Sequence, residues 1–111
     1  MATIPVTPLV KGSGVNLQML AAAAGGDQFP ISGQEDVIIR NLGGASINAT
    51  FVAQNVCNQG VVHNLVVVVP NTANMETHVR GLDPQRFADG NKMCQITYSA
   101  VVTVWIGITS G

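Results

Sequence analysis

The sequence has 111 residues, a length that fits one domain and leaves no room for a catalytic domain plus a regulatory one. Only 10% of the residues are charged and 47% are hydrophobic, so the surface must be rich in uncharged polar and apolar groups. With a net charge of −1 and scattered Lys and Arg residues, the chain lacks the basic stripe that binds nucleic acid. The longest aliphatic run, Leu65 to Val69, is far shorter than the roughly 20 residues that span a membrane. We therefore expect protein partners, and neither nucleic acid nor membrane.

The first twelve residues contain Pro5 and Pro8 and carry little charge, which is typical of an extended arm or an edge strand. A free apolar terminus is normally disordered unless something holds it. Two roles are therefore open for residues 1–12. The arm docks on a neighbouring subunit through Ile4 and Val6, or it adds an edge strand to its own sheet.

One later segment, Leu17 to Ala24, has the composition of a helix. Gly25 and Gly26 follow it directly, so this helix would have at most two turns. A single short helix leaves the fold class unchanged.

The middle of the sequence predicts three strands. Ser46 to Gln54 alternates between apolar and polar residues, which is the period of a strand with one buried face. Val61 to Val69 is apolar on both faces, apart from His63 and Asn64, and we expect a strand that is covered on both sides. Asp36 to Asn41 is a weaker candidate that a glycine turn ends.

The C-terminal part predicts a weak strand at Met75 to Leu82 and a long strand from Ile96 to Ile108, straight or bent near Ala100. Trp105 falls on the polar face of the long strand. An aromatic residue on such a face often marks an interface. The alternative is that both faces are covered, as Val101 on the same side suggests.

A second candidate contact is the pair Arg86 and Phe87, in the predicted loop before the Asp89-Gly90 turn. The candidate interface residues of the chain are thus Ile4, Val6, Arg86, Phe87 and Trp105.

Short strands separated by turns predict an all-β fold, namely a compact antiparallel β-sandwich or a small β-barrel. Residues 13–111 would form this single β domain, with residues 1–12 as the extended arm or edge strand. At most one short helix is expected.

Catalysis requires groups of tuned acidity brought together, and no motif joins the two histidines to the scattered carboxylates. His63 reads as a hydrogen-bonded core or interface residue, and His78 as part of a solvated polar face. Cys57 and Cys94 lack the spacing of a zinc or redox motif; they are buried free thiols or, alternatively, a disulfide. We expect no enzyme activity, no metal and no cofactor.

Several short sequence motifs of the chain are similar to motifs found in one family. The phrase from Ile96 to Val104, preceded by Phe87 to Gly90, resembles small virion proteins encoded beside the major capsid protein of tailed bacteriophages. Gly25 to Phe29, then Gly33, and then Val37 to Asn41 are similar to an upstream phrase of the same proteins.

This resemblance to capsid decoration (cement) proteins implies a β-sandwich or β-barrel unit that binds the outside of the capsid and braces neighbouring capsomers. It also implies that the partner is the major capsid protein, that the chain is a homo-oligomer, with a trimer favoured, and that it is located on the virion exterior after assembly in the host cytoplasm.

Two other classes of function are open. A small β-sandwich binding module, such as the carbohydrate-binding or receptor-binding part of a phage fibre, would need exposed aromatic residues, and the chain has one Trp, one Tyr and three Phe. A small hydrolase or isomerase would need an acid, base and nucleophile constellation that the sequence does not supply.

Overall fold

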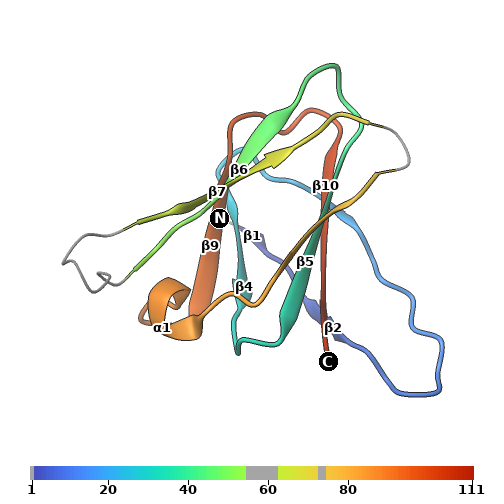
Figure 1. The fold of residues 1–111 in the computed structure, drawn as a ribbon, viewed down its shortest axis with the longest axis vertical. Coiled ribbons are helices and arrows are strands. Elements are labelled where there is room, and N and C mark those ends of the chain that lie inside the picture. The colour runs from blue at the N-terminus through green and yellow to red at the C-terminus, as the bar shows by residue number, and fades with distance from the viewer. Residues whose placement is uncertain (1, 55–62, 73–74) are drawn as a thin grey trace.

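Ten strands and one short helix make up the computed structural model, which describes residues 2–54, 63–72 and 75–111 (Figure 1). Sheet A has the strand order β1 (Ala2–Thr3), β4 (Asp27–Pro30), β9 (Met93–Tyr98), β6 (Ile47–Phe51) and β7 (Leu65–Val69). Sheet B has the order β2 (Val6–Pro8), β10 (Val104–Ser110), β5 (Glu35–Asn41) and β8 (Thr77–Arg80), and β3 (Leu20–Ala21) also pairs with β10. The prediction of an all-β sandwich is confirmed.

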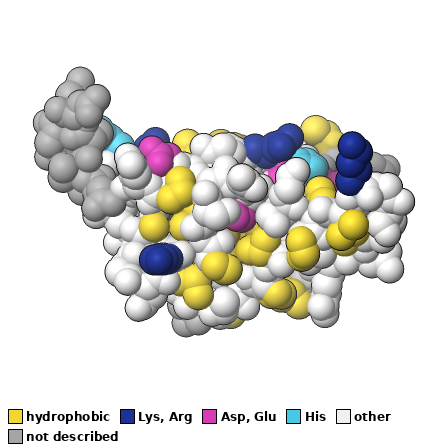
Figure 2. All heavy atoms as spheres, turned by 90° about the horizontal axis from the view of Figure 1, so that it is seen from below, with side chains coloured by type: hydrophobic (Ala, Val, Ile, Leu, Met, Phe, Trp, Pro, Cys, Tyr) yellow, Lys and Arg dark blue, Asp and Glu magenta, His cyan; other side chains and the backbone are white. Residues whose placement is uncertain are grey.

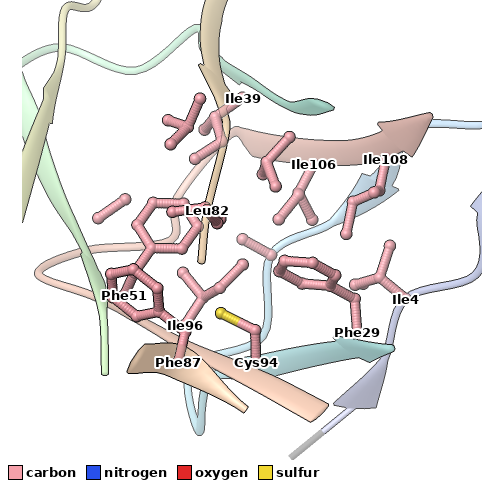
Figure 3. Packing of buried hydrophobic residues seen from close by; sticks show 14 of the residues in the cluster. Ile4, Phe29, Ile39, Phe51, Leu82, Phe87, Cys94, Ile96, Ile106 and Ile108 are labelled. Atoms are coloured by element: carbon pink, nitrogen blue, oxygen red, sulfur yellow. The ribbon is translucent and has the colours of Figure 1, made fainter. Parts of the chain in front are cut away.

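The core lies between the two sheets, where alternate residues of each strand point inward. Ile47, Ala49 and Phe51 of β6 are buried, as the alternation of that segment predicts. Figure 3 shows Phe29 and Phe51 in this core together with isoleucines from both sheets. Packing of these apolar side chains stabilises the fold, because it removes their surfaces from water.

Cys94 is a free thiol inside the core, near the ring of Phe29 (Figure 3). Burial raises the pKa of its thiol to about 12, and the carboxylates of Asp89 and Glu35 add to the shift. A buried thiol of this kind is inert, because the thiolate is the reactive form. Cys57, the other cysteine of the prediction, lies outside the described residues.

The N-terminal arm is part of both sheets. β1 runs parallel to β4, and β2 runs parallel to β10; these two are the parallel pairs among the described strands. Ile4, between β1 and β2, is only 2% exposed and lies beside Phe29 and Ile108 (Figure 3). The structure thus agrees with the edge-strand alternative, and Ile4 is covered by its own chain instead of being free for a neighbour.

The predicted helix at Leu17 to Ala24 is wrong, because this segment contains β3 and pairs with Trp105 and Ile106 of β10. The helix of the structure is α1 (Pro84–Phe87). Its N-cap is Asp83, whose carboxylate accepts a hydrogen bond from the Gln85 amide at 2.9 Å. Proline in the first turn fits because its missing N–H has no partner there in any helix.

The predicted long C-terminal strand is two strands, since the chain leaves sheet A after Tyr98 and enters sheet B at Val104. The break is close to Ala100, where the prediction allowed a bend. It includes Thr103 at a φ of 55°, a left-handed conformation that is uncommon for a β-branched residue.

The prediction of a strand covered on both faces at Val61 to Val69 is also wrong. The strand in this region is β7, and Val61 and Val62 lie outside the described residues. Val66 is 55% exposed and Val68 is 62% exposed. The reason is position, because β7 is the last strand of sheet A and these two side chains point away from the core.

Candidate docking surface

The two ends of the sandwich differ in their charge. The end that carries α1, called here the charged end, collects Glu35, Asp36, Arg80, Asp83, Arg86, Asp89 and Lys92. Figure 2 views the molecule from this end, and Lys, Arg, Asp, Glu and His side chains all reach its surface. The opposite end, called the apolar end, is formed by the loops 42–46 and 99–103, which meet at the top of Figure 1.

Carboxylates order the turns of the charged end. The Glu35 carboxylate accepts hydrogen bonds from the Ser32 amide (2.8 Å), the Ser32 hydroxyl (2.5 Å) and the Gly33 amide (3.1 Å). Burial by itself would raise the pKa of Glu35, but the hydrogen bonds from Ser32 and Gly33 together outweigh burial and hold the pKa below its ordinary value. This turn is therefore stabilised by a charged group.

Asp89 plays the same part in the turn before β9. Its carboxylate accepts hydrogen bonds from the amides of Met93 and Asn91 and from the Gln95 side chain, at 3.0, 2.8 and 2.9 Å. These bonds, the one from Met93 most of all, lower the pKa of Asp89. The carboxylate is thus used for local structure at this turn.

A neutral side chain orders the apolar end. The buried Asn41 amide donates to the carbonyls of Ala45 (2.8 Å) and Val69 (3.2 Å), and its oxygen accepts from the Gly43 amide (3.0 Å). The Leu42 amide donates to the Thr103 carbonyl at 3.0 Å, which joins the two loops. These hydrogen bonds, which order the two loops, are all made by uncharged groups.

Between the two loops is a hollow of about 280 Å³ that no charged side chain lines. Its lining residues are Asn41, Gly43, Gly44, Ala45, Ser46, Ile47, Ala100 and Val102. The hollow is partly open to solvent.

Three large apolar side chains are exposed at this end: Val102 (76%), Leu42 (46%) and Trp105 (39%). Trp105 pairs with Arg40 across the sheet, so Leu42 is its diagonal neighbour on the outer face of sheet B. Diagonal neighbours lie about 7–8 Å apart, within reach of an indole ring. We call Leu42, Val102 and Trp105 the apolar-end patch.

Trp105 is the one sequence-predicted candidate that belongs to this patch. Val6 is half-buried in β2 and packs against the core. Phe87 is buried, so the predicted surface contact through its ring does not fit the structure. The five predicted residues are therefore spread over the molecule and do not form one site.

Arg86 has a structural contact instead of a free side chain. Its guanidinium donates two hydrogen bonds to the His63 carbonyl, from Nε at 3.2 Å and from Nη2 at 2.6 Å. It also lies 4.7 Å from the centre of the Phe87 ring. Arg86 thus ties α1 to the segment that leads into β7.

The histidines occupy surface positions. His63 is exposed and precedes β7, so its assignment to an apolar strand face is wrong. His78 is exposed as predicted, and its Nδ1 lies 2.8 Å from the Asp36 carboxylate. Within residues 2–54, 63–72 and 75–111, no three His, Cys, Asp or Glu side chains are grouped to hold a metal ion. In the same ranges no helix is long and apolar enough to cross a membrane.

Sequence reasoning missed Leu42 and Val102. Alternation placed Val102 on the inward face of a continuous strand, but the turn at 99–103 removes it from any strand. The Gly43-Gly44 pair was the available signal for Leu42, because a residue beside a turn has less cover than one in mid-strand.

Comparisons with known proteins give no relative from which a role could be transferred. No protein-family model matches the chain, and no curated protein or solved structure shows significant similarity to it.

Proposed function

We propose that the chain is a structural virion protein without enzyme activity, which binds the outside of a phage capsid as a homo-oligomer and stabilises contacts between capsomers. The proposal starts from the resemblance of its short sequence phrases to capsid decoration proteins. The structural observation that supports it is the apolar-end patch, a group of exposed apolar side chains beside an uncharged hollow.

The patch has the composition of an interface centre. Buried interface cores are depleted in charge and enriched in tryptophan, and a few such residues carry most of the binding energy. The hollow of about 280 Å³ has room for one apolar side chain of a partner. On the major capsid protein, the matching feature would be a protruding apolar residue on an uncharged surface.

The alternative of a carbohydrate-binding module has less support. Sugar platforms use several exposed aromatic rings. Phe29, Phe51 and Phe87 are buried, and the Tyr98 hydroxyl donates to the buried Asp27 carboxylate at 2.8 Å. Trp105 alone remains as an exposed ring.

The test is co-sedimentation of the purified chain with capsid shells. The shells are assembled from the major capsid protein whose gene lies nearest to the gene of this chain. The parent chain should bind, and Val102→Asp should weaken binding about tenfold or more, because it places a charge in the interface. Val10→Asp is the matched control, since Val10 is 58% exposed and follows β2 at the other end.

A parent chain that stays in the supernatant at high micromolar concentration would refute capsid binding. Equal losses for Val102→Asp and Val10→Asp would refute the apolar-end patch as the docking surface while leaving capsid binding intact.

A further inference from the structure

β7 is an edge strand without the usual protection against pairing with another chain. No described strand pairs with its second edge. Its five residues, Leu65 to Val69, are all aliphatic, and Val66 and Val68 point outward and are more than half exposed. A flat apolar edge of this kind presents unpaired N–H and C=O groups to any strand that can lie beside it.

The other sheet edges carry the features that proteins use to prevent such pairing. β1 and β3 are two residues long. β2 ends in a proline, which cannot donate to a neighbouring strand. β8 contains His78 and Arg80, and charged side chains on an edge strand oppose pairing. β7 therefore differs from every other edge that the structure describes.

We propose that β7 pairs with β7 of a second copy of this chain, antiparallel and about a twofold axis, so that the two A sheets form one continuous sheet. This inference does not depend on the capsid-binding proposal, because it concerns the free edge of sheet A, at β7, and a different partner.

The strand is complementary to itself. With Val67 opposite its counterpart, Leu65 faces Val69 and Val66 faces Val68, so all five residues of each copy are paired and the outward valines meet. The following residue, Pro70, ends the pairing segment on each side.

Charge also favours a second copy as the partner. β7 contains no charged residue, and the outward residues of its neighbour β6 are Asn48 and Thr50. Two copies can therefore approach without burying an unpaired charge, whereas an acidic or basic partner segment would find no counter-charge here.

The geometry favours a dimer over the trimer that the resemblance implies. A closed ring of three requires β7 to pair with a different edge of the next copy. Those edges are the short, proline-containing or charged ones. A twofold contact uses the same unprotected edge in both copies.

The first experiment is sedimentation equilibrium of the full chain. The parent should be a dimer, and the double variant Val66→Lys/Val68→Lys should be a folded monomer whose dimerisation is weakened about tenfold or more, because like charges would face each other across the axis. Val10→Lys is the matched control, since Val10 is 58% exposed and follows β2 of sheet B, away from β7, and it should remain a dimer. Thermal melts confirm that each variant is folded.

The second experiment tests the register. In a Cys57→Ser background, an oxidised mixture of the V66C and V68C variants should cross-link into mixed dimers, and either variant alone should cross-link several-fold less, because position 66 faces position 68.

A parent chain that is monomeric at high micromolar concentration, or trimeric, overturns the proposal. So does a double lysine variant that keeps the oligomeric state of the parent, or equal cross-linking in the mixed and single samples. Capsid binding in the co-sedimentation assay is a separate readout, so the two proposals can fail independently.

Discussion

The first and last residues of β5 form a natural comparison between the two ends of the molecule. Glu35 and Asn41 are both buried, and each accepts or donates three side-chain hydrogen bonds that fix the adjoining loop. The carboxylate faces mainly N–H and O–H donors, whereas the amide faces two carbonyls and one N–H. The same strand therefore anchors a charged turn at one end and a neutral loop at the other.

This difference shows how the hollow and its two loops can be left without charged groups and still be ordered, although Arg40 lies opposite Trp105 in sheet B. A neutral amide can satisfy donors and acceptors alike, so the loop next to the apolar-end patch is hydrogen-bonded without a charged group. A charged anchor at the same place would add a desolvation cost to any docking event there.

Asn41→Asp should have the largest effect. The new carboxylate would face the carbonyl oxygens of Ala45 and Val69 with no donor to offer them, and we expect a loss of about 3 kcal/mol in the free energy of unfolding at pH 7. Urea titrations of parent and variant at pH 7 and pH 4 measure it. The loss should shrink at pH 4, where a protonated carboxyl can donate. A loss that is unchanged at pH 4 would contradict this account.

Glu35→Gln should cost about 2 kcal/mol at pH 7, because a neutral amide replaces a charged acceptor of three hydrogen bonds. The folded-state pKa of Glu35 is lowered, so its contribution is complete above the ordinary value of 4.5 and is lost as pH falls through the folded-state value. The difference between parent and variant should therefore narrow below pH 4.5. Asp89 also has a lowered pKa, so the parent should lose stability in acid through this group as well. The variant still contains Asp89 and should show the same additional loss.

A pair of glycine substitutions, one at each end of the molecule, should have the smallest effects on stability. Gly33, in the turn held by Glu35, has a φ of +99°, and a Cβ there would lie 3.4 Å from Pro84. Gly33→Ala should cost about 1–2 kcal/mol. Gly44, in the apolar-end loop, has open space around it and no positive φ, so Gly44→Ala should be neutral or stabilise by up to about 1 kcal/mol. Thermal melts of the parent and the two variants measure these changes in stability. A larger loss of stability for Gly44→Ala than for Gly33→Ala would contradict the prediction.

Much of the fold was predictable from residue alternation. The strand at Ser46 to Gln54 appears in the structure as β6 because one of its faces is buried and the alternation follows it. The weaker candidate at Asp36 to Asn41, which was recognised by the glycine turn after it, appears as β5, where Val37, Ile38 and Ile39 are buried in succession. The helix α1 also had a readable signal, Asp83 before Pro84, but Arg86 and Phe87 were predicted to lie in a loop.

The candidate surface was less predictable, because exposure depends on which strands become neighbours. A run of valines does not reveal that Val66 and Val68 will lie at a sheet edge. The break before β10 depends on Thr103 adopting a left-handed conformation. A threonine does not predict this conformation, because β-branched residues rarely adopt it. Trp105 was predicted because it interrupts a polar face. This pattern can be recognised in the sequence without knowing which strands are neighbours.

The position of β10 in sheet B has a consequence for how the chain reaches its native state. β10 is the last strand in the sequence, yet it lies between β2 and β5, and Val6 pairs with Ile108 almost the whole chain away. On the ribosome, the N-terminal arm and β5 are made first and must wait for β10 before sheet B can close. Contacts between such distant segments require the closure of long loops, which slows folding and prolongs the exposure of apolar strands. The newly made chain therefore passes through a period in which β2 has no partner strand, and this period ends only when β10 is in place.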